Sequence, residues 1–235
     1  MSHNITIEGG TSVRLPTAGK YCDRDIVITA TGGGADGDDL ATSIVDRTIT
    51  EYYSDKVTTV GAYAFCKCNK LASVSCPNVI TIKDDAFDVC YGLTSANFPN
   101  VETIGRNAFY SCTNLASVSC PNVRTIGVNA FSSCPKIQSI SLLKCESIDS
   151  AAFAGCSSLT ALILGTTEKV CTATVDSVLR NTPIAKNAGY IYVPSSLIES
   201  YKTATNWTTY ATQFRALEDH TVDGTITGAL DESKI

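Results

Sequence analysis

The sequence predicts a repeat solenoid built mainly from β-strands, and the spacing of three residue types predicts it. Five phenylalanines stand 22 residues apart, each followed three positions later by a cysteine and six positions later by an aliphatic residue. The three columns are Phe65, Phe87, Phe109, Phe131 and Phe153; Cys68, Cys90, Cys112, Cys134 and Cys156; and Leu71, Leu93, Leu115, Ile137 and Leu159. Such a fixed period indicates one structural unit that stacks on its neighbours to share a core.

Each repeat is expected to form one coil with two short parallel strands. The repeats are residues 57–78, 79–100, 101–122, 123–144 and 145–166, and they follow V-x-x-I-G-x-x-A-F-x-x-C-x-x-L-x-x-V-x-C-P-N. Apolar Val74 and Cys76 alternate with polar neighbours, the period of a half-buried strand, and Pro77 ends it. Residues 79–82 predict a second strand. We therefore expect two flat sides joined by a tight Ala-Phe turn, with coils about 4.8 Å apart.

This pattern resembles the BspA-like, treponemal-type leucine-rich repeat, most clearly over residues 101–118. The matching positions there are Val101, Ile104, Ala108, Phe109, Cys112, Leu115 and Val118. Lys83 and Asp149 depart from it at the glycine position. The resemblance implies a binding scaffold at a cell surface or on a virion.

The cysteines are predicted to fill the core. There are eleven, an odd number, and five share the register of the phenylalanines, which is typical of small buried hydrophobes rather than of a disulfide framework. Cys76 and Cys120 are also expected to point inward, since Phe98, Leu142 and Leu164 fill the same position elsewhere.

Cys66 is the thiol expected to be exposed. Its column continues with Asp88, Tyr110, Ser132 and Ala154, a mixture typical of an outward position. Cys66 and Cys68 do not predict a zinc site, because a closed site needs four convergent ligands and the chain has two histidines, both near its ends. We expect no metal and no cofactor.

Residues beyond the fifth repeat are expected to close the solenoid. Residues 167–194 are a degenerate sixth repeat, in which Val178 and Leu179 replace Ala-Phe and residues 190–193 form a last strand before Pro194. Residues 195–219 form a helical and aromatic cap, and residues 220–235 a tail with another edge strand.

Within the cap, Ser196 and Glu199 have the spacing of a capping box, which predicts a helix start. This helix carries Leu197, Ile198 and Tyr201. Trp207, Tyr210 and Phe214 follow it. An aromatic cluster could be a platform for a sugar, but its place directly after the last coil favours a lid, and the resemblance implies a similar closing stretch.

The N-terminal part is expected to hold three segments. Residues 1–31 predict a small β module with strands at 5–7, 12–15 and 26–29, residues 32–38 a Gly/Asp-rich linker, and residues 39–56 an N-terminal cap with Asp39 beginning a short helix. The linker lacks the spacing and closing glutamate of an EF-hand. The module resembles short modules of phage and prophage tail accessory proteins, which implies a part of a virion or surface structure.

Composition excludes several classes of protein. A net charge of -5 and a pI near 5.0 argue against binding to nucleic acid or to an anionic membrane surface. No run approaches the roughly 20 apolar residues of a membrane span, and the N-terminus lacks the pattern of a secretory signal. The sequence therefore does not predict where the protein is located.

Catalysis is not expected. His3 and His220 lie outside the repeats with no motif around them, and adjacent Asp84 and Asp85 are expected to be solvated on a turn. No phosphate-binding or nucleophile motif appears in the sequence. We predict a protein that is not an enzyme.

The candidate ligand-binding residues are the outward positions of the first strand in each repeat. They are Ser73, Ser75, Ser95, Asn97, Ser117, Ser119, Ser139 and Ser141, continued by Ala161 and Ile163. These small side chains offer hydrogen bonds but not the Trp, Tyr or Arg anchors of protein hot spots.

Two functions are compatible with this pattern. The first is a scaffold that recognises a protein or a glycan, in adhesion or host interaction. The second is a structural component of a phage or prophage particle, with the repeats as spacer. Serines also suit any exposed strand, so the face could lack a ligand altogether. The sequence does not predict the oligomeric state.

Overall fold

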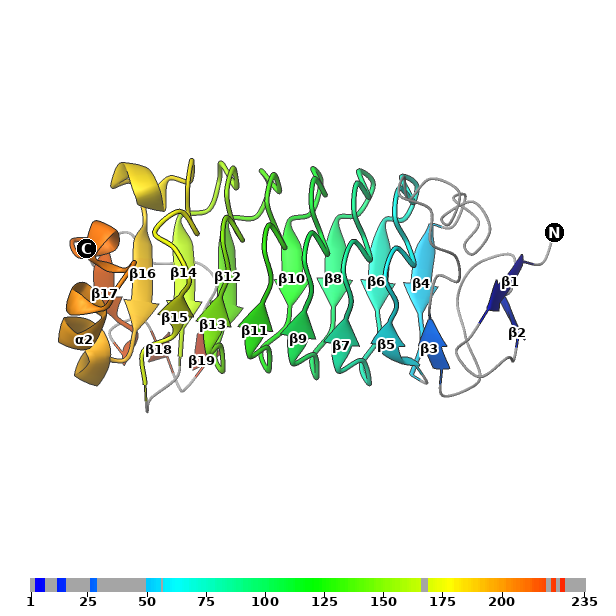
Figure 1. The fold of residues 1–235 in the computed structure, drawn as a ribbon, viewed down its shortest axis with the longest axis horizontal. Coiled ribbons are helices and arrows are strands. Elements are labelled where there is room, and N and C mark those ends of the chain that lie inside the picture. The colour runs from blue at the N-terminus through cyan, green and yellow to red at the C-terminus, as the bar shows by residue number, and fades with distance from the viewer. Residues whose placement is uncertain are drawn as a thin grey trace.

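The computed structural model describes residues 3–6, 12–15, 26–28, 50–55, 57–165, 169–218, 221–222 and 225–226. It is an elongated β-solenoid whose coils stack side by side, with the short helix α2 (Ile198–Thr203) at one end (Figure 1). The predicted fold class, a mainly β repeat solenoid with parallel strands, is confirmed.

One side of the solenoid consists of two four-stranded parallel sheets. The first contains β4 (Glu51–Tyr53), β6 (Ser73–Ser75), β8 (Ser95–Asn97) and β10 (Ser117–Ser119). The second contains β12 (Ser139–Leu142), β14 (Ala161–Leu164), β16 (Tyr190–Val193) and β17 (Phe214–Ala216). Equivalent residues pair within each sheet, such as Ser73 with Ser95, so outward side chains on paired strands stand beside their counterparts.

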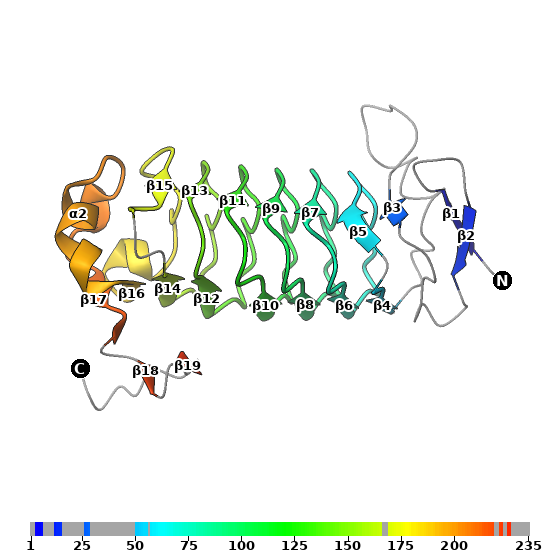
Figure 2. The ribbon, with the colours of Figure 1, turned by 90° about the horizontal axis from the view of Figure 1, so that it is seen from below.

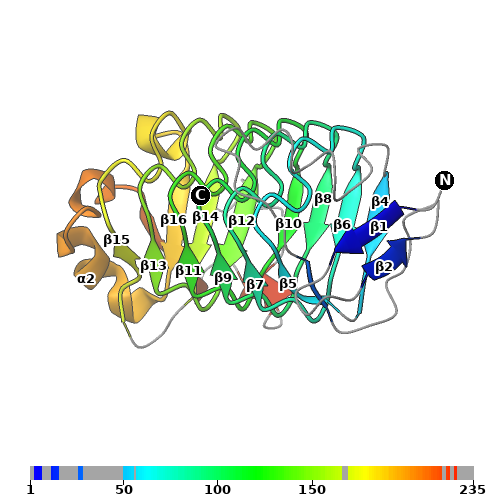
Figure 3. The same cartoon turned by 45° about the vertical axis from the view of Figure 1, so that its right-hand side comes forward.

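The other flat side is a single seven-stranded sheet, seen as a second row of strands in Figures 2 and 3. Its strands are β3 (Ile26–Ile28), β5 (Val57–Val60), β7 (Thr81–Ile82), β9 (Thr103–Ile104), β11 (Thr125–Ile126), β13 (Ser147–Ile148) and β15 (Thr172–Ala173). All of its pairs are parallel.

The three strands predicted in residues 1–31 do not form one sheet. β1 (His3–Thr6) and β2 (Ser12–Leu15) pair antiparallel with each other, whereas β3 pairs in parallel with β5 of the first repeat. β3 thus extends the solenoid, because a parallel strand edge accepts one more strand of the same period. The predicted linker and the helix at Asp39 lie outside the described residues.

Another short antiparallel pair follows the cap. It joins β18 (Thr221–Val222) to β19 (Thr225–Ile226), in the segment where the sequence predicts an edge strand.

The third side of each coil is the tight turn around the Ala-Phe pair. The Phe65 N–H donates to the carbonyl of Ala86 in the next coil at 2.7 Å, and the bond repeats in every coil. In the last one the Phe153 N–H donates to Val178 at 3.0 Å, so Val178 takes the alanine position as predicted. Left-handed residues flank each turn, two positions before and after the phenylalanine: Tyr63 and Lys67, Asp85 and Val89, Asn107 and Ser111, Asn129 and Ser133, Ala151 and Gly155.

The phenylalanine column is a continuous stack of buried rings. Consecutive centroids lie 5.0 to 5.5 Å apart with nearly parallel planes, from Phe65 to Phe153. All five rings are fully buried. Because each ring is covered by the next coil, the core depends on stacking rather than on any single coil.

The cysteine column fills the space beside these rings, and its thiols also donate hydrogen bonds to backbone carbonyls. The Cys90 thiol donates to the Phe65 carbonyl at 2.9 Å, and the Cys112 thiol donates to Phe87 at 3.1 Å. Burial raises the pKa of the Cys112 thiol well above its ordinary value. No cysteine of the described residues is in a disulfide.

The prediction of an exposed thiol at Cys66 is wrong. Cys66 is 2% exposed, its Sγ lies 3.8 Å from Asp88 Oδ2, and burial raises its pKa to about 12. Ser132 and Ala154 in the same column are buried as well, while Tyr110 is exposed. The Cys66 side chain lies against Asp88 of the next coil, which accounts for its burial.

The aromatic residues that follow the last coil are buried, and two of them hydrogen-bond to the backbone of that coil. Tyr201, Trp207, Tyr210 and Phe214 are buried. The Trp207 Nε1–H donates to the Cys171 carbonyl at 2.6 Å, and the Cys171 N–H donates to the Tyr201 hydroxyl at 2.8 Å. These bonds occupy polar groups beside the edge strand β15, which would otherwise be left unpaired.

The predicted capping box is wrong. Between β16 and α2 lies the 3-10 turn η2 (Ser195–Leu197), and α2 begins after Leu197 with no side-chain cap. The Ser195 N–H instead donates to the Glu218 carboxylate at 2.9 Å. A distant carboxylate therefore takes the place of the local cap. Two further 3-10 turns are η1 (Ile184–Lys186) and η3 (Thr208–Tyr210).

Candidate ligand-binding face

All eight predicted serine and asparagine positions lie on the outer face of the strands β6 to β12. Asn97, Ser117, Ser119 and Ser139 are exposed, and Ser73, Ser75, Ser95 and Ser141 are partly exposed. Between them, Val74, Ala96 and Ile140 point into the core. The strand alternation thus brings the eight side chains together as two ladders, which we call the serine face.

The serine face has its own hydrogen bonds between coils. The Asn97 Nδ2 donates to the Ser75 hydroxyl at 3.1 Å. Just before β8, the Thr94 hydroxyl donates to the Ala72 carbonyl at 2.9 Å. Hydroxyl groups can both donate and accept, so the face offers a ligand regularly spaced partners without a fixed charge.

The two residues predicted to continue the ladders are not exposed. Ala161 is 4% and Ile163 is 8% exposed, and both pack with Tyr192 in a small apolar cluster. Leu143, Tyr190 and Leu217 lie against this cluster. The prediction is wrong here because Tyr190 and Tyr192 of β16 stand directly beside Ala161 and Ile163 and cover them.

Aromatic residues stand at both ends of the serine face, a feature that sequence reasoning missed. Tyr53 on β4 is 39% exposed and pairs with Ser75 on β6. At the other end, the Arg215 guanidinium lies 4.3 Å from the centroid of the Tyr190 ring. The alternation in residues 190–193 could have indicated the outward tyrosines, whereas Arg215 could be found only from the pairing of β16 with β17.

The two acidic residues of the second repeat stabilise a turn. Asp84 Oδ1 accepts a bond from the Arg106 N–H at 2.8 Å, and Asp85 Oδ1 accepts one from Asn107 Nδ2 at 3.0 Å. Among the residues that the structure describes, no cluster of histidine, cysteine, aspartate or glutamate could hold a metal ion. Both carboxylates therefore have a structural partner in the next coil.

A comparison with known protein families shows which family these repeats belong to. The BspA type leucine rich repeat region matches residues 48–184 in six copies, which is more than half of the chain. The chain belongs to the BspA type leucine-rich repeat family.

Solved structures of other leucine-rich repeat proteins have a similar fold. One from Bacteroides ovatus matches with a TM-score of 0.56 and 23% identity over 72% of this chain and 42% of its own, so this chain corresponds to less than half of its length. The leucine-rich repeat protein of T. pallidum matches with a TM-score of 0.51 and 27% identity over 61% of this chain and 72% of its own.

A leucine-rich cell surface protein from Faecalibacterium prausnitzii matches with a TM-score of 0.44 and 21% identity over 70% of this chain and 51% of its own. A search of curated proteins found no match. No helix within the described ranges is long and apolar enough to cross a membrane.

Proposed function

We propose that this protein is a non-enzymatic binding scaffold whose serine face holds a protein or a glycan, in adhesion or host contact. The observation that supports this most is the composition of the face, in which regularly spaced hydroxyl groups lie between aromatic ends. A leucine-rich repeat solenoid is a rigid support whose exposed face can vary without disturbing the core.

The geometry favours an extended ligand. The face from β6 to β12 crosses three coil spacings, roughly 14 Å at about 4.8 Å between neighbouring strands. Tyr53 and the Tyr190–Arg215 pair would hold the ends of a longer ligand, since tyrosine and arginine dominate binding hot spots. The serines between them would provide hydrogen bonds.

The alternative function, a spacer in a phage or prophage particle, rests on the resemblance of residues 1–31 alone. The matching family and the similar structures are leucine-rich repeat proteins, and they give it no support. We therefore favour the scaffold.

The test is a screen of the full chain against a glycan array and host surface proteins, followed by the double variant Ser95→Arg with Ser117→Arg. We expect the variant to lose binding while its melting temperature stays unchanged, because both side chains point to solvent. A matched control places the same two charges on two adjacent coils of the other sheet, as Thr103→Arg with Thr125→Arg, whose native residues are exposed. If the serine-face variant keeps full affinity for every partner identified, the face is not the site.

A further inference from the structure

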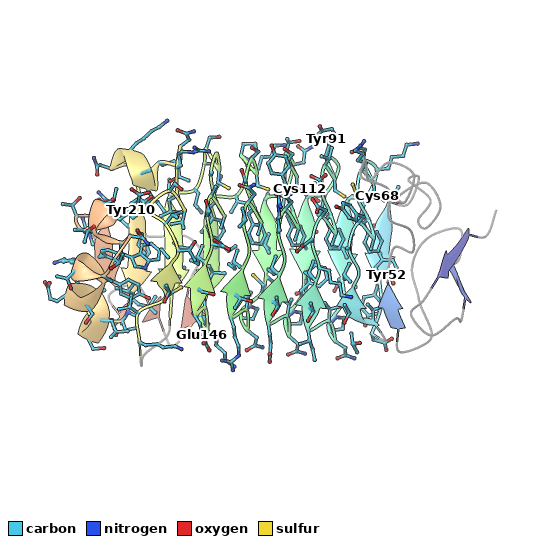
Figure 4. The ribbon with its side chains drawn as sticks, viewed as in Figure 1. Tyr52, Cys68, Tyr91, Cys112, Glu146 and Tyr210 are labelled. Atoms are coloured by element: carbon cyan, nitrogen blue, oxygen red, sulfur yellow. The ribbon has the colours of Figure 1, made fainter. Side chains whose placement is uncertain are left out.

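A concave surface lies at the corner where the coils turn from the first pair of sheets toward the seven-stranded sheet. We call it the corner groove. It has a volume of about 370 Å³ and is lined by the three asparagines Asn78, Asn100 and Asn122, by Ile80, Glu102 and Arg124, and by Lys144. That volume is within the range of roughly 300–1,000 Å³ typical of small-molecule sites. Glu146, the next residue in the Arg124 column, lies on the edge of the solenoid opposite Tyr91 and the turns (Figure 4).

The floor of the corner groove is held by backbone hydrogen bonds. The Glu102 N–H donates to the Ile80 carbonyl and the Arg124 N–H donates to the Glu102 carbonyl, both at 2.8 Å. The Glu146 N–H continues the series to Arg124 at 2.7 Å. A ligand would therefore meet side chains that already stand in fixed register, which lowers the ordering cost of binding.

The asparagines present oriented amide groups along the groove. Their Nδ2 atoms donate to carbonyls of the preceding coil: Asn78 to Asp55 at 2.6 Å, Asn100 to Pro77 at 2.8 Å and Asn122 to Pro99 at 2.8 Å. Each bond uses one of the two amide N–H groups and fixes the amide plane. A second N–H remains on Asn78 and Asn100, whereas Asn122 Nδ2 also donates to Asn100 Oδ1 at 3.5 Å. Each amide oxygen has two acceptor sites, so the row still offers sugar hydroxyls both donors and acceptors.

The charge of the groove differs between its ends. In the fourth repeat Lys144 replaces the asparagine of the first three, and it is exposed. Beside it the Glu146 carboxylate binds both Arg124 at 2.6 Å and Lys169 at 3.0 Å, so one anion is shared by two cations. Lys144 adds a further positive charge at this end, whereas Glu102 makes the middle of the groove unfavourable for an anion.

From these contacts we infer that the corner groove binds a short, otherwise neutral oligosaccharide that carries one acidic sugar at the end lying against Lys144. The three amides bind the neutral sugars through their hydroxyls, and the ammonium group of Lys144 binds the single carboxylate. Glu102 disfavours a chain with a carboxylate on every unit. This site is separate from the serine face and does not depend on it.

The experiment uses the full chain and three probes. They are a neutral tetrasaccharide that carries one additional terminal sialic acid, the same tetrasaccharide without the sialic acid, and a tetramer of galacturonic acid. Isothermal titration calorimetry should give the highest affinity for the first probe and the lowest for the third. Lys144→Asn restores the residue of the other repeats and should reduce affinity for the sialylated probe roughly tenfold, to the level of the neutral one, because a charge-assisted hydrogen bond is lost. The neutral probe should bind the variant unchanged.

The matched control is Lys136→Asn, an exposed lysine that bonds to Asn114 on another part of the coil, and it should leave all three affinities unchanged. Ser95→Arg with Ser117→Arg should also leave them unchanged, which separates this site from the serine face. The inference is overturned if the sialylated probe does not bind, if Lys144→Asn does not lower its affinity, or if the galacturonic acid tetramer binds equally well.

Discussion

The turn side and the outer sheet side of each coil differ in how closely they repeat. On the turn side, Ala-Phe and the following cysteine recur through five coils with the same stacking and the same hydrogen bonds. On the sheet side, hydroxyl groups in the middle give way to Tyr53 at one end and to Tyr190 with Arg215 at the other. The comparison shows that the solenoid holds its core residues constant and concentrates its chemical variation on exposed positions.

The physical reason is the number of neighbours that each side chain meets. A ring in the phenylalanine column is covered by a ring on each side, so a change of size there affects two coils. An outward serine contacts its counterparts and solvent, so it can change at little cost in stability.

The largest expected loss of stability comes from removing the central ring of the phenylalanine column. Phe109→Ala removes a fully buried ring stacked between Phe87 and Phe131, and should lower the free energy of unfolding by about 3–5 kcal/mol in urea titrations followed by circular dichroism. Ser117→Ala, in the same repeat but on the outer sheet face, is the control and should change it by less than about 0.5 kcal/mol. Equal effects of the two changes would refute the distinction between the sides.

A smaller effect is expected at the lid. Trp207→Phe keeps an aromatic ring but removes the Nε1–H donor to the Cys171 carbonyl, leaving a buried acceptor, and should cost about 1–3 kcal/mol of unfolding free energy. Tyr91→Phe, at a residue that is 46% exposed, should have no measurable effect. An unchanged urea midpoint for Trp207→Phe would show that the indole bond is not needed for closure.

Replacing one residue of the turns should raise the stability of the protein. Val89 has φ of 57°, a left-handed conformation that strains a β-branched side chain, whereas the equivalent Ser111 tolerates it better. Val89→Asn should therefore raise the free energy of unfolding by about 1 kcal/mol, and the reciprocal change Ser111→Val should lower it by a similar amount. Thermal melts of both variants test this, and a loss of stability in Val89→Asn would contradict it.

The smallest expected effect depends on pH. Burial, with a smaller contribution from Asp85, raises the pKa of Asp88 from 3.8 to about 6, although Lys67 and the Cys66 thiol act against the shift. Because the pKa is higher in the folded state, the contribution of Asp88 to stability is complete below about pH 4 and is lost as the pH rises through 6.

Asp88→Asn should consequently gain up to about 1 kcal/mol relative to the wild type between pH 4 and pH 7.5, after allowance for solvent screening at a half-buried carboxylate. Urea titrations at both pH values measure this. Glu102→Gln, which removes a carboxylate at an exposed position, is measured in parallel as the control. A stability difference between Asp88→Asn and the wild type that does not change with pH would argue against a raised pKa.

Much of the fold could be predicted from the sequence because the period is exact. The spacing of Phe, Cys and Leu assigns the buried columns, and strand alternation assigns all eight serine-face residues to the outside. The aromatic lid follows from the need to cover the last coil. The match of Val178 to the alanine position agrees with its carbonyl accepting the bond from the Phe153 N–H.

What the sequence by itself determined is therefore the repeating part, in which each residue meets a copy of itself and local spacing is enough. The tertiary structure decided those features in which a residue contacts a residue of a different type or from a different kind of segment. Examples are the burial of Cys66 against Asp88, the covering of Ala161 and Ile163 beside β16, the pairing of β3 with β5, and the bond of Glu218 to Ser195. These contacts join segments that differ in sequence or lie outside the 22-residue period, so no repeat pattern could reveal them.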